Sequence, residues 1–329
     1  MKDVIGLGAL NVDFIYEVAG FELGKGSIKF RSGAEIFTDL EEFESAKRLL
    51  QSVGKLRGKS GGGQAANTVV ALSRMGFSTG FVGKVGEDSE GDFLIRSMMG
   101  VDTSRILKDE RSGICLSVLD EFKDRSTLIL PNCNDTLTFD EIDLDYINNT
   151  QFLHMTSFIG DLPLMAQRRI AEEIFPDVKI TFDPGEIYAK RNLREILPII
   201  KRSFVIFITD REIELLTGKD FSTGARELLN MGCSIVVCKL GERGSHILSQ
   251  TQEFSIPAER VEVMDKTGAG DVYAAGFLAG LLLERPLYEC AMIATKAAAL
   301  SITGYGRGKY PDKLFLTQVL RSLSQPSEN

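Results

Sequence analysis

Short apolar segments alternate with longer amphipathic segments along most of the chain. Several apolar segments are rich in Val, Ile and Phe and have no polar face, which is typical of parallel strands buried on both sides. We expect strands at Val4–Leu7, Thr79–Val82, Phe152–Met155, Lys179–Phe182, Val205–Ile208 and Ser234–Lys239. Helical patterns occur at Ala65–Met75, Gly91–Met99, Pro163–Ile174, Thr223–Asn230, Asp271–Leu283, Leu287–Ile302 and Pro311–Leu323. The alternation predicts an α/β fold with a mostly parallel sheet flanked by helices.

Two regions interrupt this rhythm, and both precede the regular half of the chain. The first, Asn11 to Ser60, contains strand-like segments at Phe14–Val18 and Ile28–Arg31, followed by a charged, helix-like segment at Thr38–Ser52. The second is a hairpin pattern, in which Ile114–Leu119 and Thr127–Leu130 flank a polar turn. We expect these regions, about 13–37 and 112–131, to form a small β-rich lid beside the main α/β body.

Composition and charge limit the possible partners. The chain has 329 residues, 38 Lys and Arg against 46 Asp and Glu, and a formal net charge of −8. An acidic protein of this kind is a poor candidate for binding nucleic acid, although a local phosphate site needs no net positive charge. The longest apolar stretch, Val272–Leu283, is too short to span a bilayer and suits a buried helix. We expect a cytoplasmic protein with no membrane partner.

The first motif that could carry chemistry is Asp265-Lys266-Thr267-Gly268-Ala269-Gly270-Asp271, which leads into a helix of small residues. A glycine-rich turn before a helix directs unpaired backbone N–H groups at one point, where an anion can bind. Asp271 could instead be only the N-cap of that helix. Since an N-cap does not need three small residues before it, the motif favours an anion site.

Two further glycine motifs are weaker. Ser60-Gly61-Gly62-Gly63-Gln64-Ala65-Ala66-Asn67 opens a helix, with Asn67 one turn in, and could be a ligand loop or a flexible turn. Cys238-Lys239-Leu240-Gly241-Glu242-Arg243-Gly244 follows a predicted strand, where α/β proteins often bind nucleotides, or is an ordinary tight turn. The dinucleotide fingerprint is broken at Asn11, which argues against a dehydrogenase, and the P-loop motif is absent from the sequence.

The three motifs in this order resemble those of the ribokinase-like (PfkB) family of carbohydrate and nucleoside kinases. Gly62 to Asn67 resembles the first family signature and Asp265 to Asp271 the second. Gly6-x-Gly8-x-x-Asn11-x-Asp13 is similar to the first strand of the family and its substrate-binding Asp. The resemblance covers nearly the whole chain, and it implies a single kinase domain over residues 1–329 with a doubly wound sheet and a small β lid.

The resemblance also implies roles for individual residues. Asp271 would take the proton from a substrate hydroxyl, and the N–H groups of Gly268, Ala269 and Gly270 would form an anion hole for the transferred phosphoryl group. The acceptor's hydroxyls would be held by Asn11, Asp13, Gly62, Gly63 and Asn67. ATP would contact Thr209, Glu212, Lys239, Gly241, Gly244 and Thr267.

Several positions depart from the family pattern. Glu212 is retained and could order Mg²⁺ through water, but Thr209 replaces the usual Asn. Lys239 stands where many members have Thr, and could reach an ATP phosphate as a point charge. The family also suggests a monovalent cation such as K⁺ near Asp265, and a homodimer formed through the lid.

The acceptor is open at this stage. A small sugar with a reactive hydroxymethyl group is the default for the family. The long region before the first glycine motif is similar in layout to the adenosine-kinase branch, and Phe14, Phe30 and Phe37 could form a slot for a nucleobase. A third alternative is a homologue that binds ligands without catalysis, which the intact Asp271 motif disfavours.

Overall fold

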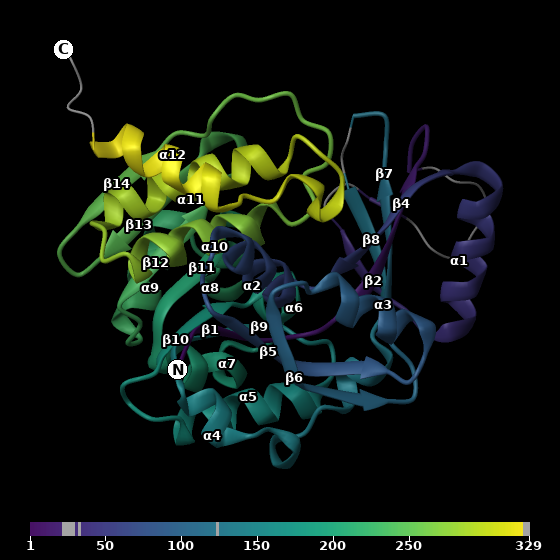
Figure 1. The fold of residues 1–329 in the computed structure, drawn as a ribbon, viewed down its shortest axis with the longest axis horizontal. Helices are drawn as coiled ribbons and strands as arrows, with labels where there is room; N and C mark the ends of the chain where they lie inside the picture. Colours follow the sequence, from purple (N-terminus) through teal and green to yellow (C-terminus); the bar gives the residue numbers. More distant parts are fainter. Residues whose placement is uncertain (22–29, 32–33, 123–124, 325–329) are drawn as a thin grey trace.

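A computed structural model of the protein describes residues 1–21, 30–31, 34–122 and 125–324. The described residues form a large α/β body and a smaller β unit beside it (Figure 1). Within these ranges, no helix has both the length and the hydropathy needed to cross a lipid bilayer.

A nine-stranded sheet forms the centre of the α/β body. Its strands lie in the order β14 (Glu253–Ile256), β13 (Ser245–Ser249), β12 (Ile235–Lys239), β11 (Ser203–Thr209), β10 (Lys179–Asp183), β9 (Thr150–Thr156), β1 (Lys2–Leu7), β5 (Thr79–Gly86) and β6 (Val101–Asp109). Neighbours from β12 to β6 are parallel, while β13 and β14 add an antiparallel edge. The predicted doubly wound sheet is confirmed, and each of the six predicted strands lies in it.

Helices cover both faces of this sheet because its strands are apolar on both sides. Along β11, Val205 and Phe207 belong to one core, and Ile206 and Ile208 to the other. The first core is covered by α2 (Gln64–Met75), α3 (Ser89–Ser97), α10 (Ala269–Leu282), α11 (Leu287–Ser301) and α12 (Lys313–Ser324). The second is covered by α4 (Leu144–Asn148), α5 (Asp161–Glu173), α6 (Gly185–Ala189), α7 (Leu193–Arg202), α8 (Asp210–Thr217) and α9 (Phe221–Asn230). Short 3₁₀ turns occur at η1 (Asn132–Thr136), η2 (Phe139–Glu141), η3 (Gly241–Arg243) and η4 (Gly306–Lys309).

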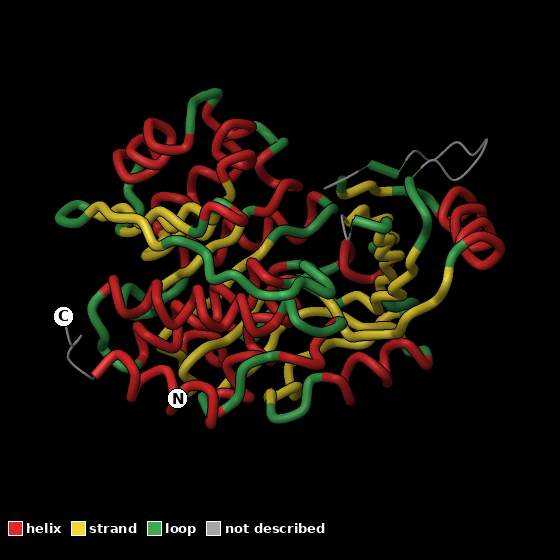
Figure 2. The backbone as a smooth tube through the Cα atoms, turned by 90° about the horizontal axis from the view of Figure 1, so that it is seen from above, coloured by secondary structure: helices red, strands yellow, loops and turns green. Residues whose placement is uncertain are grey.

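The smaller unit is a five-stranded sheet, called the small sheet below. Its order is β3 (Glu35–Phe37), β8 (Arg125–Leu130), β7 (Gly113–Leu119), β2 (Asn11–Glu17) and β4 (Lys55–Gly62). Helix α1 (Leu40–Val53) packs Phe43 and Leu50 on one face, against Leu116, Val118 and Leu128. Figures 1 and 2 show α1 on the side of this sheet away from the α/β body. The alternate residues of the same strands therefore face the body.

The two predicted regions of irregular rhythm contain β2, β3, α1, most of β4 and the β7–β8 hairpin, whereas the predicted lid bounds of about 13–37 and 112–131 leave out α1 and β4. Strand β4 was not predicted, because its residues are largely exposed and polar and show no alternation. In the predicted strand Ile28–Arg31, positions 28 and 29 lie outside the described residues, and the prediction is wrong for Phe30 and Arg31, which are not in a strand. Phe30 is instead buried in the cluster under α1.

The position of α1 also bears on the predicted homodimer. The apolar face of the small sheet is already covered by α1 of the same chain. A second copy could pair with this face only by displacing α1. The homodimer stays a prediction, and the edge strands β3 and β4 are the parts of the small sheet through which it could form.

Candidate active site

Three adjacent parallel strands end in polar side chains at the same edge of the large sheet. Strands β10, β11 and β12 end at Asp183, Thr209 and Lys239, and Thr209 lies directly opposite Lys239 in the register. The carboxyl edge is where open α/β sheets bind ligands, because loops diverge there and helix N-termini point toward it. These three side chains therefore lie where a ligand would be bound.

Two glycine-rich turns place the N-termini of α2 and α10 over this edge. Gly63 caps α2 with φ of 104°, and a Cβ there would lie 2.0 Å from the carbonyl oxygen of Ala9, so only glycine fits. Gly268 caps α10 with φ of 75°. The two helices are joined where Asn67 Nδ2 donates to Asp271 Oδ2 at 2.8 Å. The motifs that sequence analysis singled out separately are thus in contact.

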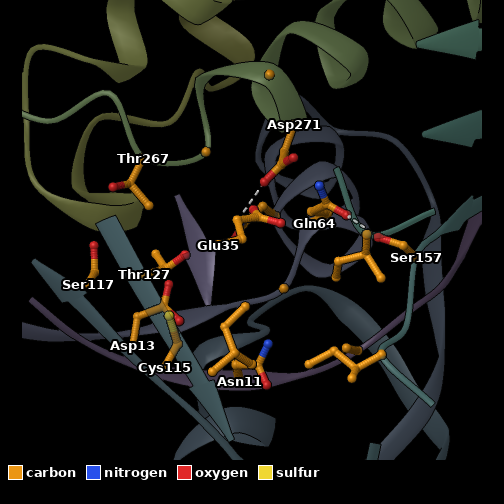
Figure 3. A pocket seen from close by; sticks show the side chains of 18 of the residues that line it. Asn11, Asp13, Glu35, Gln64, Cys115, Ser117, Thr127, Ser157, Thr267 and Asp271 are labelled. Carbon is orange, nitrogen blue, oxygen red and sulfur yellow. Dashed lines mark hydrogen bonds between the residues drawn. The ribbon is translucent and has the colours of Figure 1, made fainter. Parts of the chain in front are cut away.

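A first cavity of about 410 Å³ lies between these turns and the small sheet. In Figure 3, Asp271 lies on one side of it, and Asp13 and Cys115 on the other. Most of the residues expected at the site line it, namely Asn11, Asp13, Gly63, Asn67, Glu212, Lys239, Thr267, Gly268, Ala269, Gly270 and Asp271. Residues from the two ends of the chain and from its middle are therefore brought together.

A second cavity of about 880 Å³ opens on the other side of the α10 turn. It is lined by Thr209, Gly241 and Gly244, as expected of the nucleotide side, and by the apolar residues Val261, Ala298 and Ile302. The two cavities share four lining residues, which are Lys239, Lys266, Ala269 and Gly270. A group passing from one cavity to the other would pass the first turn of α10 and the Lys239 side chain.

Lys239 is the nearly buried cation at this junction, whereas Lys266 is exposed and pairs with Glu242. Lys239 Nζ lies 2.5 Å from Asp183 Oδ2, and both side chains are nearly buried. Burial alone would lower the pKa of Lys239, but the carboxylates of Asp183 and Glu212 hold it above its ordinary value. The ammonium group is therefore charged, and it lies close to Gly270, where a Cβ would be 3.3 Å from Nζ.

Glu212 and Thr209 form a capping box at the start of α8. The Thr209 N–H donates to Glu212 Oε2 at 2.8 Å, and the Glu212 N–H donates to Thr209 Oγ1 at 3.2 Å. Burial raises the pKa of Glu212 to about 7, against the lowering effect of Lys239. The Thr209 oxygen is used as an acceptor, which leaves its O–H free to donate to a ligand.

Two more carboxyl groups in the first cavity have pKa values raised to about 7. Burial raises the pKa of Asp271 from 3.8 to about 7, although the hydrogen bond from Asn67 opposes the change. Burial likewise raises the pKa of Asp13 to about 7, against the attraction of Arg125 and Arg307. A carboxyl group with a pKa near neutrality is suited to accept a proton and release it again.

Two expected residues lie outside both cavity linings. Gly62 packs against Asp13, and a Cβ at Gly62 would lie 2.3 Å from Asp13 Oδ2. The buried Asp265 carboxylate accepts the Thr267 N–H at 2.9 Å and the Gly306 N–H at 3.2 Å, so both of its oxygens join backbone segments. The monovalent cation near Asp265 stays a prediction. Among the described residues, no cluster of three or more His, Cys, Asp or Glu side chains could hold a metal ion.

Sequence analysis missed several polar residues of the first cavity. Glu35, Ser117 and Arg125 reach it from the small sheet, and Gln64 lies on the α/β side, where Ser157 Oγ donates to its Oε1 at 3.3 Å (Figure 3). Asp183 was also missed, although it directly follows a predicted strand and could have been found from the position of strand ends. The residues of the small sheet had no comparable signal, because their direction depends on which face α1 covers.

Comparison with known proteins places the chain in a family. Residues 36–313 match the profile of the pfkB family carbohydrate kinases. An uncharacterized sugar kinase of Archaeoglobus fulgidus is 38% identical, over 72% of this chain and 96% of that protein. An ATP-dependent ribose-1-phosphate kinase of Halopiger xanaduensis is 28% identical, over 77% of this chain and 84% of that protein. The crystal structure of an adenosine kinase from Sinorhizobium meliloti superposes with a TM-score of 0.86 at 23% identity, covering 97% and 99% of the two chains.

The fold is that of the ribokinase-like kinases, with a large, mostly parallel sheet between layers of helices. The chain belongs to the pfkB family of carbohydrate kinases. It is therefore an ATP-dependent phosphotransferase with an alcohol group as acceptor, in the class that includes sugar and nucleoside kinases.

The raised pKa of Asp271 predicts a pH-dependent cost to stability. The Asp271 carboxyl group ionises near pH 3.8 in the unfolded chain and near pH 7 in the folded protein. The cost to stability is therefore absent below about pH 4, grows as the pH rises and is complete above pH 7. We expect Asp271→Asn to be more stable than the wild type at pH 8 by roughly 3 kcal/mol, and the difference to shrink toward pH 4. Urea unfolding of both proteins at pH 8 and at pH 4 measures this difference in the free energy of unfolding. The exposed control Asp177→Asn should show no such trend, and an equal difference at both pH values for Asp271→Asn would contradict the assignment.

Proposed function

We propose that the protein transfers the γ-phosphoryl group of ATP to a hydroxymethyl group of a small sugar. The first cavity binds the sugar, and the second binds the nucleotide. Asp271 takes the proton from the attacking hydroxyl, and the N–H groups of Gly268, Ala269 and Gly270 bind the phosphoryl oxygens. The observation that carries this proposal is that the two cavities meet at the first turn of α10, beside Asp271.

The arrangement suits phosphoryl transfer because this reaction depends mainly on alignment and charge stabilisation. The start of α10 offers backbone N–H groups and the positive end of a helix dipole to the transferred group. Lys239 adds a full positive charge at the same place. Asp271 lies in the same turn, so the base and the anion hole keep a fixed distance from each other.

A sugar is favoured over a nucleoside by the polarity of the first cavity. Its wall on the small sheet carries Asp13, Glu35, Ser117 and Arg125. The hydroxyls of Ser117 and Thr267 are buried and have no hydrogen-bond partner among the described residues. Unpaired buried hydroxyls are costly, and the hydroxyls of a sugar would satisfy them.

The three aromatic side chains expected to form a slot for a nucleobase lie elsewhere, and the Phe that lines the first cavity is Phe158. Neither Phe14, Phe30 nor Phe37 is among the residues that line the first cavity. Phe30 is buried under α1, and Phe14 packs against the cores with Lys59 over its ring. The observation that keeps a nucleoside kinase as the second candidate is the helix α1 before the first glycine motif, in the layout that suggested the adenosine-kinase branch.

Magnesium fits the charge of the junction between the cavities. Asp183, Glu212 and Asp271 all act on the ammonium group of Lys239, so these three carboxylates outweigh its single positive charge when all are ionised. Glu212 would hold Mg²⁺ through water, as hard cations prefer oxygen ligands and Mg²⁺ retains part of its hydration. When bound, the ion would neutralise charge on the ATP phosphates.

Gly241 and Gly244 would border the nucleotide, where side chains would narrow the second cavity.

The proposed reaction makes a prediction about the acceptor and about Asp271 as the base. With ATP and Mg²⁺, we expect ADP release with one neutral or phosphorylated sugar from a panel that also contains nucleosides. Asp271→Asn should lower kcat by about 10²–10⁴-fold, because the general base is lost while the shape of the site is kept. A nucleoside as the only acceptor would favour the second candidate. Turnover that persists in Asp271→Asn would contradict the role of Asp271, and ATP binding without turnover on any acceptor would favour a non-catalytic homologue.

Another prediction separates the two roles of Lys239. Lys239→Met leaves the Asp183 carboxylate buried without its partner, and we expect a loss of about 3–5 kcal/mol of stability. Adding Asp183→Asn removes that charge and should restore most of the stability. The added substitution should not restore kcat/KM for ATP. We expect this ratio to fall about 10²-fold both in Lys239→Met and in the double variant. Recovery of activity together with stability in the double variant would show that Lys239 acts only on the fold.

A further inference from the structure

Arg307 reaches the active site from a C-terminal segment that none of the three sequence motifs includes. It lies in η4, and its guanidinium contacts three elements. Nε donates to Asn67 Oδ1 in α2 at 3.0 Å, and Nη1 donates to the carbonyl and the hydroxyl of Ser97 in α3 at 3.3 and 3.2 Å. Nη2 lies 3.5 Å from the carbonyl oxygen of Gly62 in β4. One side chain therefore joins the small sheet to two helices of the α/β body.

The contact with Asn67 completes a chain of hydrogen bonds to the base. The Asn67 amide accepts from Arg307 through Oδ1 and donates to Asp271 through Nδ2. Asn67 is buried, so water cannot easily replace either partner. The backbone carbonyl of Asp271 also accepts from Thr68 Oγ1 at 3.1 Å, which ties the next residue of α2 to the same turn.

The two partners of Asn67 permit only one orientation of its amide. In the reversed orientation, Nδ2 would face the Arg307 Nε–H and Oδ1 would face the Asp271 carboxylate, so both contacts would be repulsive. Asp271 alone fixes the amide only while it is ionised. Once Asp271 has taken a proton, its O–H can donate to an amide oxygen, and the reversed amide becomes acceptable. Arg307 is always a donor and keeps the amide in place at that moment.

Resting on the proposed role of Asp271 as the base, we propose that Arg307 is a positioning residue of the active site. It fixes the amide of Asn67, and Asn67 fixes the carboxylate of Asp271 in its proton-accepting orientation. Arg307 also holds the Gly62 carbonyl, next to which Asp13 packs. The residue that aligns the base is thus in contact with the segment that faces the acceptor.

The charges around Asp271 determine the expected direction of the effect. The ionisable groups that face it from the surrounding elements are Lys239 on β12, Asp183 on β10, Arg125 on β8, Tyr310 after η4, and Arg307. Removing Arg307 removes one nearby positive charge and loosens the Asn67 N–H that stabilises the carboxylate. Both changes favour the protonated acid, so the pKa of Asp271 should rise further.

The test measures the titration of Asp271 directly by carboxyl ¹³C NMR on protein labelled at Asp. The Asp271 resonance is the one missing in Asp271→Asn. We expect Arg307→Met to raise its midpoint by about one pH unit, and Arg307→Lys, which keeps the charge and can donate to Asn67, to raise it less. Arg74→Met is the matched control, because Arg74 Nη1 donates to the Arg307 carbonyl at 2.9 Å without contacting Asn67 or Asp271. It should leave the midpoint unchanged.

Turnover gives an independent measurement with the acceptor found for the wild type. Arg307→Met should lower kcat about tenfold, shift the acid limb of the kcat profile to higher pH and leave KM for ATP unchanged. In an Asn67→Ala background, the same substitution should have little further effect on kcat, because the two residues act in series.

Two results would overturn the role of Arg307. One is an unchanged Asp271 midpoint in a folded Arg307 variant, with Arg307→Lys available should Arg307→Met fail to fold. The other is a loss of kcat that adds fully to that of Asn67→Ala. Failure of the proposed function is a different result, because turnover would then persist in Asp271→Asn while the titration still reports whether Arg307 acts through Asn67.

Discussion

The close contact between the N-termini of α2 and α10 is the constraint on which the active site depends. Both helices begin at glycines with positive φ, and two residues of α2, Asn67 and Thr68, donate hydrogen bonds to Asp271 of α10. The distance between Asn67 Nδ2 and Asp271 Oδ2 is 2.8 Å, so the two helix N-termini are in direct contact. The same packing sets the two cavities on either side of one helix turn. A shift of either helix would separate Asn67 from Asp271 and break this contact.

This arrangement carries an energetic cost that is paid for function. Asp13, Glu212 and Asp271 are carboxyl groups in a poorly hydrated region, and burial raises the pKa of each to about 7. A chain selected only for stability would place neutral or apolar residues there. Lys239 is the ammonium group that pairs with the carboxylates of Asp183 and Glu212, and cations and donor groups brought by the substrates would complete the charge balance. Ligand binding should therefore stabilise the fold.

The small sheet shows how one strand pattern serves two purposes. Leu116 and Val118 face α1, while Cys115 and Ser117, their neighbours in β7, line the first cavity. Helix α1 of the same chain covers the apolar outer face of the small sheet. The inner face carries polar residues such as Asp13 and Glu35, which line the first cavity.

The parts of the fold that sequence predicted are those with strong local signals. Buried parallel strands such as β11 are apolar on both faces, and α2 and α10 follow glycine-rich turns, so their positions could be read from short segments. The edge strand β4 was missed because it is polar and gains its structure from pairing with β2. Arg307 was missed for a related reason. Its partner Asn67 is 240 residues away in the chain, so the contact cannot be predicted from the residues next to Arg307.

A structure of the protein with Mg²⁺, a non-hydrolysable ATP analogue and its acceptor would test the central claim most directly. The account predicts the terminal phosphate over the first turn of α10 beside Lys239, with the attacking hydroxyl of the acceptor in hydrogen-bond contact with Asp271. It would be contradicted by a terminal phosphate directed away from that turn, or by a reactive hydroxyl that contacts Asp13 while Asp271 remains bound only to Asn67.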